Sequence, residues 1–305
     1  MEVHQLRYLV AVADEGSFTR AARREHVSQS GVSAQVKQLE RELGQPLFDR
    51  SDRLVTLTEA GRAALPHARD ALAALDSLRG AVDDVAGLVR GGVRVGMVTG
   101  CTIPWFFDGL EAVHGAHPGL TVNLVEGPSD ELQREVVAGR LDLALVGYAG
   151  APDAGLDVVV VVDEPLVAAV GPDHRWARRR TVALGALRDE RVICLAPGTG
   201  IRLAFDRAVA AHGVDVPVGL EASSPEVVLA LAARGLGIAV VARSMVAGTE
   251  LHAVRLDAPD ARSQLGLVWR AGTSASVART AVLDALTAAL AASREDPRPS
   301  RRSEA

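Results

Sequence analysis

Small polar and basic side chains recur through the run that follows Ser28, at positions that share one face of a helix. At 100° per residue, Ser33 and Lys37 lie about 100–140° from Val32, which begins an apolar stripe. Small side chains let a helix approach base edges in a DNA major groove, where a glutamine such as Gln29 pairs with adenine. A lysine there would meet phosphates, which supply affinity rather than sequence information. The same spacing fits an ordinary solvated helix face, so these residues alone leave both interpretations open.

Three short helices and a hairpin are predicted to hold this face in place. Ser17 suits the N-cap of the second helix, and Ser28 suits the N-cap of the third. Two extended runs, 47–50 and 54–57, predict a hairpin. Arg53 lies near its tip, from which it could reach a minor groove or the DNA backbone.

A long amphipathic helix is predicted to start at Glu59, with Thr58 as its cap. Apolar residues recur every three or four positions from Leu65 to Val85, which makes one stripe over about 28 residues. Such a stripe either packs on its own chain or forms a dimer seam, and the spacing does not choose between them. Pro66 should kink or locally disturb the helix, because proline removes a backbone hydrogen bond.

After Gly91 and Gly92 the sequence alternates short apolar runs with helical periodicity. This alternation is typical of an α/β region whose parallel sheets are covered by helices on both faces. The predicted strands are 93–98, 121–125, 141–146, 158–162, 166–170, 191–195, 238–241 and 265–269, and the predicted helices are 104–116, 129–138, 201–212, 225–234 and 276–292.

Polar or glycine-bearing segments follow three of these strands, which is where open α/β sheets bind ligands. Backbone N–H groups at a helix start favour an anion such as a carboxylate. Each segment could also serve only to cap a helix or to turn the chain. The candidate binding residues in these segments are Thr99, Gly100, Cys101, Thr102, Tyr148 and Thr199.

Composition and motifs exclude several classes of protein. The 305 residues, 48% of them hydrophobic and 23% charged, suffice for about two domains with real cores. The start of the chain does not resemble a signal peptide and no apolar run suits a membrane span, so a cytoplasmic protein without membrane contact is expected. The α/β region has no Gly-x-Ser-x-Gly elbow, no Walker-type loop and no dinucleotide fingerprint after a strand, so no enzyme is expected.

Metal and redox chemistry find little support in the residue pattern. The eight histidines are scattered without metal-ligand spacing, so neither a metal nor a cofactor is expected. Cys101 and Cys194 could form a redox switch, although Cys194 lies within an apolar strand, where a buried cysteine is common.

Four segments together resemble the signature of LysR-type transcriptional regulators. They are SFTRAA (17–22), VSQSGVS (27–33), QLERELGQPLFDR (38–50) and LTEAG (57–61). Further on, GPDH (171–174) and GLGIAVVARS (235–244) look like recurring segments of the sensor region of that family. The resemblance implies a winged helix-turn-helix, a linker helix that dimerises, and two α/β lobes that resemble periplasmic binding proteins and hold a small-molecule effector between them.

The resemblance also implies domain bounds and site residues. It implies a DNA-binding domain at 1–58, a linker helix at 59–90 and an effector domain at 91–292. The tail at 293–305 is rich in Pro, Arg, Ser and Glu, and this composition predicts disorder. Within the effector domain, lobe I would hold 91–161 and 267–292, and lobe II would hold 162–266. The implied base-reading residues are Gln29, Ser30 and Ser33, the implied phosphate contacts are Ser17, Thr19 and Lys37, and Arg53 is the implied wing contact.

We therefore expect a regulator that binds double-stranded promoter DNA as a dimer or tetramer and responds to a small effector. The alternative is a solute-binding protein without a DNA function. That alternative would require export, and it gives the N-terminal helices no role.

Overall fold

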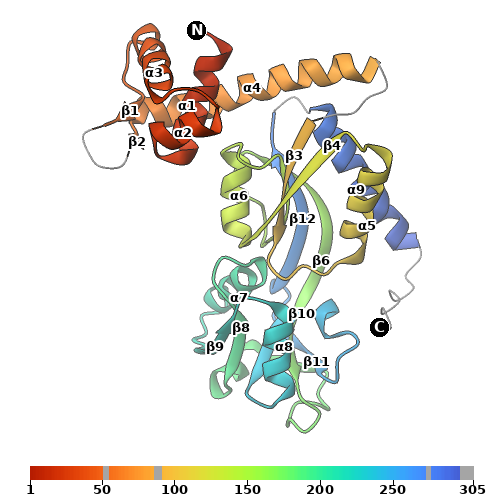
Figure 1. Cartoon of the computed structure of the whole chain (residues 1–305). Helices are drawn as coiled ribbons and strands as arrows, with labels where there is room; N and C mark the ends of the chain where they lie inside the picture. The colour runs from red at the N-terminus through yellow and green to blue at the C-terminus, as the bar shows by residue number, and fades with distance from the viewer. Residues whose placement is uncertain (51–54, 86–90, 273–275, 296–305) are drawn as a thin grey trace. The chain divides into compact units, whose positions relative to one another are not determined.

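The computed structural model describes residues 1–50, 55–85, 91–272 and 276–295 (Figure 1). These residues belong to two compact units. The first spans Met1–Gly91 and Thr273–Thr280, and the second spans Gly92–Gly272 and Ala281–Ala305.

Three short helices open the first unit: α1 (Val3–Glu15), α2 (Phe18–Arg24) and α3 (Gln29–Leu43). The predicted caps are confirmed, because the hydroxyl of Ser17 accepts the N–H of Arg20 and the hydroxyl of Ser28 accepts the N–H of Gly31. Gly44 ends α3 in the left-handed conformation, which glycine adopts without steric cost.

The predicted hairpin is present as β1 (Phe48–Asp49) paired with β2 (Thr56–Leu57) in antiparallel register. Its tip, with Arg53, lies outside the described residues. The long helix α4 (Glu59–Val85) begins at Thr58, whose Oγ1 accepts the N–H of Gly61 at 3.0 Å. It continues through Pro66, so proline does not end the helix.

An apolar core holds these elements together. Val32, Val36 and Leu39 of α3 are fully buried against residues of α1 and α2, and Phe48 of the hairpin joins the same cluster. The core also takes in Leu65 from the first turns of α4. The predicted inner face of α3 is therefore confirmed for Val32, Val36 and Leu39, but Leu43, which the periodicity places on the same face, is 46% exposed at the last turn of the helix.

The second unit is an α/β structure built on one continuous path of strands. Its described elements are β3 (Gly91–Val98), α5 (Pro104–Ala116), β4 (Leu120–Gly127), α6 (Ser129–Val137), β5 (Leu143–Tyr148), β6 (Leu156–Val170), β7 (Thr181–Ala183), β8 (Val192–Leu195), α7 (Gly200–Ala211), β9 (Val218–Ala222), α8 (Pro225–Ala233), β10 (Ile238–Ala242), β11 (His252–Asp257), β12 (Arg262–Arg270) and α9 (Val277–Glu295). The strand order is β4-β3-β5-β12-β6-β10-β8-β9, with β11 paired to β6 and β7.

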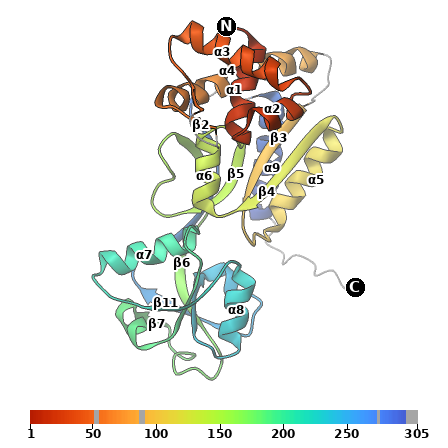
Figure 2. The ribbon, with the colours of Figure 1, turned by 60° about the vertical axis from the view of Figure 1, so that its left-hand side comes forward.

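The long strand β6 divides this path into two lobes (Figure 2). Its first part pairs with β12, up to the partners Arg262 and Pro165, and its last part pairs with β10 and β11. We call the layers around β3, β4, β5 and β12 lobe I, and those around β7 to β11 lobe II. Helices α5, α6 and α9 belong to lobe I, and α7 and α8 belong to lobe II.

The sheet is mixed, so the prediction of purely parallel sheets was wrong. Strands β3 and β5 are parallel, as are β10, β8 and β9, but β12 runs antiparallel to both β5 and β6. The two runs 158–162 and 166–170 form the single strand β6. Polar residues Asp163 and Glu164 separate these runs in sequence, and both find partners where β6 passes between the lobes.

Three strands were absent from the prediction, namely β7, β9 and β11. They are short or alternate exposed with buried residues, so they lack the continuous apolar runs of the other strands. The helices begin and end close to their predicted bounds, except that α9 continues to Glu295, beyond the predicted end at 292. Residues 293–295, predicted as the start of a disordered tail, are therefore helical.

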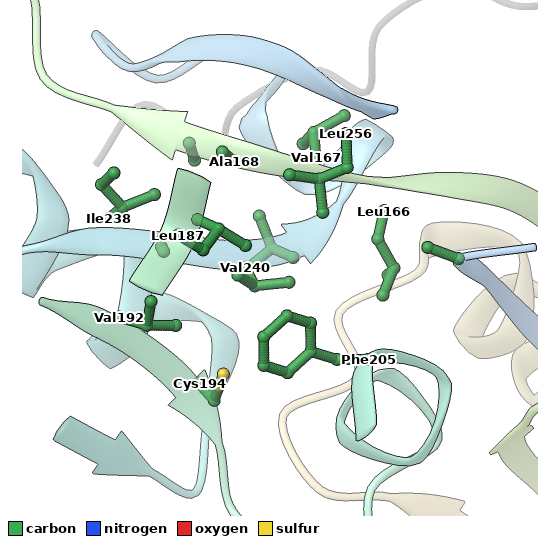
Figure 3. Close-up of a cluster of buried hydrophobic side chains, with 14 of the residues drawn as sticks. Leu166, Val167, Ala168, Leu187, Val192, Cys194, Phe205, Ile238, Val240 and Leu256 are labelled. Atoms are coloured by element: carbon green, nitrogen blue, oxygen red, sulfur yellow. The ribbon is translucent and has the colours of Figure 1, made fainter. Parts of the chain in front are cut away.

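Each lobe has its own apolar core. Figure 3 shows the core of lobe II, where Phe205 of α7 lies near Val240 of β10 and Cys194 of β8. In lobe I, Leu132 and Val136 of α6 pack with Tyr148 of β5. Among the described residues, no helix combines the length and the apolarity that crossing a membrane requires. The same residues hold no cluster of three or more His, Cys, Asp or Glu side chains suited to a metal.

Candidate nucleic-acid interface and effector cleft

Helix α3 separates its buried and exposed residues as the sequence predicted. Gln29, Ser30 and Lys37 are exposed and Ser33 is half-buried, on the side opposite the core residues. The hydroxyls of Ser28 and Ser30 lie 3.2 Å apart, so Ser30 sits at the very start of the helix. The outer face of α3 thus offers hydroxyl, amide and ammonium groups, which are the groups that contact bases and phosphates.

The two residues predicted on α2 have different surroundings. Ser17 is half-buried and its oxygen already caps α2, which leaves its O–H free in direction to donate elsewhere. Thr19 is exposed in the first turn of α2. The structure therefore holds both at the start of one helix, where backbone N–H groups favour a phosphate.

A shallow groove of about 760 Å³ lies beside the C-terminal half of α3. The basic side chains of Lys37 and Arg41 line it, together with Glu40. The Arg41 guanidinium donates to Gln38 Oε1 at 2.6 Å, which orients it along the helix. Two cations on the rim attract a polyanion. The negative charge of Glu40 weakens this attraction.

Glu40 is a residue that the sequence analysis missed. Its Oε1 accepts the N–H groups of Leu47 and Phe48 at 2.9 and 3.2 Å, and its Oε2 accepts Arg50 Nη2 at 2.9 Å. Helix periodicity gives no sign of these partners, which lie across the turn at residues 44–46.

The second candidate site lies where the carboxyl ends of lobe I strands face lobe II. Here the backbones of Gly147 and Gly200 meet so closely that a Cβ added to Gly200 would lie 2.5 Å from the Tyr148 nitrogen. The N–H of Asp130 donates to the carbonyl of Gly198 at 3.2 Å. The N-termini of α6, in lobe I, and α7, in lobe II, therefore meet at this edge.

Gly100 makes a further contact between the lobes. An added Cβ there would lie 2.7 Å from the ring of Pro225, the first residue of α8. The N–H of Gly100 donates to Glu126 Oε1 at 2.7 Å, which ties the loop after β3 to the end of β4. Gly100, Gly147 and Gly198, one from each of the three predicted segments, thus lie against the N-terminus of a helix of the other lobe. These helices are α8, α7 and α6.

The predicted cleft residues differ in how much they expose. Thr102 is exposed, and Thr99 and Cys101 are half-buried. Thr199 is buried and caps α7, accepting the N–H of Arg202 and donating to the carbonyl of Ala196.

Tyr148 is 2% exposed, and burial, with a smaller contribution from Asp163, raises the pKa of its phenol. A phenol that stays protonated can donate a hydrogen bond to an anion.

The two thiols are poor nucleophiles. Burial raises the pKa of Cys194 to about 12, and burial also raises the pKa of Cys101. Since the thiolate is the form that reacts with oxidants, the raised pKa values disfavour the reactive form of both thiols, most strongly at Cys194.

A polar network holds the strands that cross between the lobes. Asp163 of β6 accepts Arg262 Nε at 2.7 Å and Gln264 Nε2 at 3.4 Å. Glu164 Oε2 accepts the N–H of Ser244 at 2.7 Å. These bonds join β6 to β12 and to Ser244 where β6 passes from lobe I to lobe II.

Fold and site together define a class of protein: a helix-turn-helix unit whose outer helix face suits DNA, joined in one chain to a two-lobed α/β sensor. Residues 3–62 match the model of the bacterial regulatory helix-turn-helix protein, lysR family, and residues 86–291 match the LysR substrate binding domain. The chain belongs to the LysR family of DNA-binding transcriptional regulators, which carry an effector-binding domain and are not enzymes.

Known relatives and solved structures agree with this family. The RuBisCO operon transcriptional regulator of Allochromatium vinosum is 32% identical over 286 residues, which cover 91% of this chain and 93% of that protein. A full-length OxyR variant from Pseudomonas aeruginosa has a TM-score of 0.73 at 26% identity, covering 95% of this chain and 94% of its own. The regulatory domain of Synechocystis CcmR, solved in complex with 2-PG, is 28% identical with a TM-score of 0.57, covering 65% of this chain and 97% of its own.

Proposed function

We propose that this regulator reads promoter DNA through the outer face of α3 and supports that contact with phosphates on either side. Gln29, Ser30 and Ser33 contact base edges. Ser17, Thr19 and Lys37 contact phosphates, and Arg53 contacts the backbone or the minor groove from the wing. The observation that carries this proposal is the division of α3 into a face that buries Val32, Val36 and Leu39 and an outer face of small polar and basic groups.

The test is binding of the purified full chain to the DNA upstream of its own gene, titrated across salt beside an unrelated fragment. We expect selective binding that weakens as salt rises, because each phosphate contact contributes about −0.9 to the log–log slope. Lys37→Gln should reduce the slope by about one unit on both fragments. Arg188→Gln, which changes an exposed cation of the second unit, is the matched control. Equal slopes for the two variants would remove Lys37 from the interface.

We propose that the effector binds where α6, α7 and α8 begin, between lobe I and lobe II. Helix N-termini and the protonated Tyr148 favour an anion such as a carboxylate. The complex of the CcmR regulatory domain with 2-PG supports a small ligand in a domain of this fold. The effector must bind one arrangement of the lobes better than another, since equal binding shifts no equilibrium.

Thermal stability of the full chain with a panel of small carboxylates and phosphates tests this cleft. A ligand at 100 times its Kd stabilises the folded state by about 2.7 kcal/mol. Thr102→Trp should abolish the shift produced by the best compound while leaving DNA affinity unchanged, because Thr102 is exposed at the loop after β3. An unchanged shift in that variant would exclude Thr102 from the site.

The thiols do not support peroxide or disulfide sensing as a second function. Cys194 is buried with its pKa near 12, and the pKa of Cys101 is raised as well. A small-molecule effector is therefore the signal that the sensor region fits better.

We also propose that α4 mediates self-association, as a dimer or a dimer of dimers. Leu65 and Ala68 are buried in the core of their own unit, but Leu78, on the same apolar stripe, is 62% exposed. A second copy of α4 would cover this distal part. Sedimentation of Leu78→Glu should show a lower oligomer than the wild type.

Because the proposed partner of this regulator is promoter DNA, we propose that it acts in the cytoplasm.

A further inference from the structure

The segment before the wing is held from two sides by side chains of different helices. From α3, Glu40 accepts the N–H groups of Leu47 and Phe48. From the start of α4, Thr58 donates its hydroxyl to the carbonyl of Pro46 at 2.6 Å and its N–H to the carbonyl of Leu47 at 3.0 Å. Both helices therefore hold the segment through hydrogen bonds, and not through apolar packing alone.

This attachment has to come from outside the hairpin. Each strand of the hairpin has only two residues, with the partners Phe48–Leu57 and Asp49–Thr56. A two-stranded hairpin of normal length is already marginal in water, and one this short cannot fix its own direction. The contacts of Glu40 and Thr58, together with the burial of Leu47 and Phe48 in the core of the first unit, therefore fix the start of the wing.

Glu40 reaches the root of the wing tip as well. Its Oε2 accepts Arg50 Nη2 at 2.9 Å, and the Arg50 guanidinium lies 4.6 Å above the ring of Phe18. Phe18 in turn meets the ring of Phe48 edge to face at 5.7 Å.

We propose that Glu40 is the positioning residue that fixes the wing against the recognition helix α3, so that base contacts by α3 and backbone contacts by the wing occur on one DNA site together. The inference rests on the proposed DNA contacts. Glu40 touches no DNA itself. Its carboxylate accepts hydrogen bonds from two backbone N–H groups and one guanidinium. Charge-assisted bonds of this kind are about twice as strong as neutral ones.

The substitution Glu40→Gln keeps the size of the side chain and removes its charge. Glu42→Gln is the matched control, because Glu42 lies two residues further along α3 and carries the same charge. Glu42 pairs with the N-terminal amine at 2.6 Å and accepts Gln38 Nε2 at 3.1 Å, and among the described residues it makes no hydrogen bond or ion pair with residues 46–50. Both variants remove one negative charge from the DNA-binding unit, so any general electrostatic effect appears in both.

Hydrogen exchange of the full chain without DNA tests the attachment itself. We expect the amides of Leu47 and Phe48 to exchange about tenfold faster in Glu40→Gln and at the wild-type rate in Glu42→Gln. Glu40→Ala, checked by circular dichroism for its helix content, should give a larger effect. Unchanged exchange in both Glu40 variants overturns the proposal.

DNA binding tests the consequence for function. We expect Glu40→Gln to lose about tenfold in preference for the upstream fragment over the unrelated one, with a log–log salt slope smaller by about one unit because a wing contact is lost. Glu42→Gln should gain slightly on both fragments with an unchanged slope. If Glu40→Gln behaves like Glu42→Gln, the proposal is refuted. If the wild type itself shows no preference, the proposed DNA contacts fail, and the exchange rates still decide the role of Glu40.

Discussion

Gly200→Ala is expected to destabilise the second unit, although alanine is the better helix former. Gly200 begins α7, and it faces the backbone of Gly147 at the end of β5. The new Cβ would lie 2.5 Å from both the Gly147 Cα and the Tyr148 nitrogen. Ordinary contacts between such atoms are about 3.5–4.0 Å, so the facing backbones must separate by about 1 Å.

The size of the effect follows from this overlap. Overpacking of a well-packed site costs about 1–3 kcal/mol. For a domain of this size each kcal/mol changes Tm by about 2–4 °C, so Tm should fall by about 2–12 °C. Calorimetry of the full chain measures this change.

Gly115→Ala serves as the control for Gly200→Ala. Gly115 lies in the last turn of α5, and an added Cβ would meet nothing within 4 Å. Alanine there should stabilise the unit by up to about 1 kcal/mol through helix propensity alone. A Gly200→Ala chain as stable as the wild type, beside a stabilised control, would mean that the lobes do not meet through Gly147 and Gly200.

Other outcomes follow from single residues. Phe205 is 1% exposed in the core of lobe II, so Phe205→Ala should lower the free energy of unfolding by about 3–5 kcal/mol. A urea midpoint close to that of the wild type would contradict this. His26 is exposed with a φ of 55°, so His26→Gly should stabilise the first unit by about 0.5–1 kcal/mol, and a lower urea midpoint would oppose this. The thiol of Cys194, with its pKa near 12, should resist alkylation at pH 8 until the chain unfolds, and rapid labelling of native protein would disprove its burial. The bond to His212 lowers the pKa of Asp260 below its usual 3.8, so this pair stabilises the fold above that pH and ceases to do so as the pH falls through the lowered value. In an acid titration, His212→Ala should therefore lose less stability at low pH than the wild type. Identical stability profiles for the two chains would refute this.

Local chemistry made the helices of the first unit predictable. Ser17, Ser28 and Thr58 cap helices through bonds to residues three positions away, and such bonds depend only on nearby sequence. The face of α3 followed from periodicity, and burial of Val32 and Val36 confirms it. Specific contacts of single residues with DNA stay predictions.

Contacts between distant segments were out of reach of the sequence. The approach of Gly147 to Gly200 involves backbone atoms 53 positions apart, and no side-chain pattern marks it. The direction of β12 was missed for a related reason, since an apolar run does not reveal which neighbour it pairs with or in which direction. The partners of Glu40 required the turn at residues 44–46 to bring β1 back along α3.

The place of β12 in the sheet has a consequence for synthesis on the ribosome. Strands β7 to β11 of lobe II follow one another without interruption, but β12, which lies between β5 and β6 in lobe I, is made after all of them. Lobe II can therefore complete its strands while the sheet of lobe I still has a gap, with the edges of β5 and β6 unpaired. Such edges attract other strands and proteases. A truncated mRNA that ends before the codon for residue 262 would yield a chain with all the strands of lobe II but without β12 in the sheet of lobe I. Cellular quality control removes products of this kind.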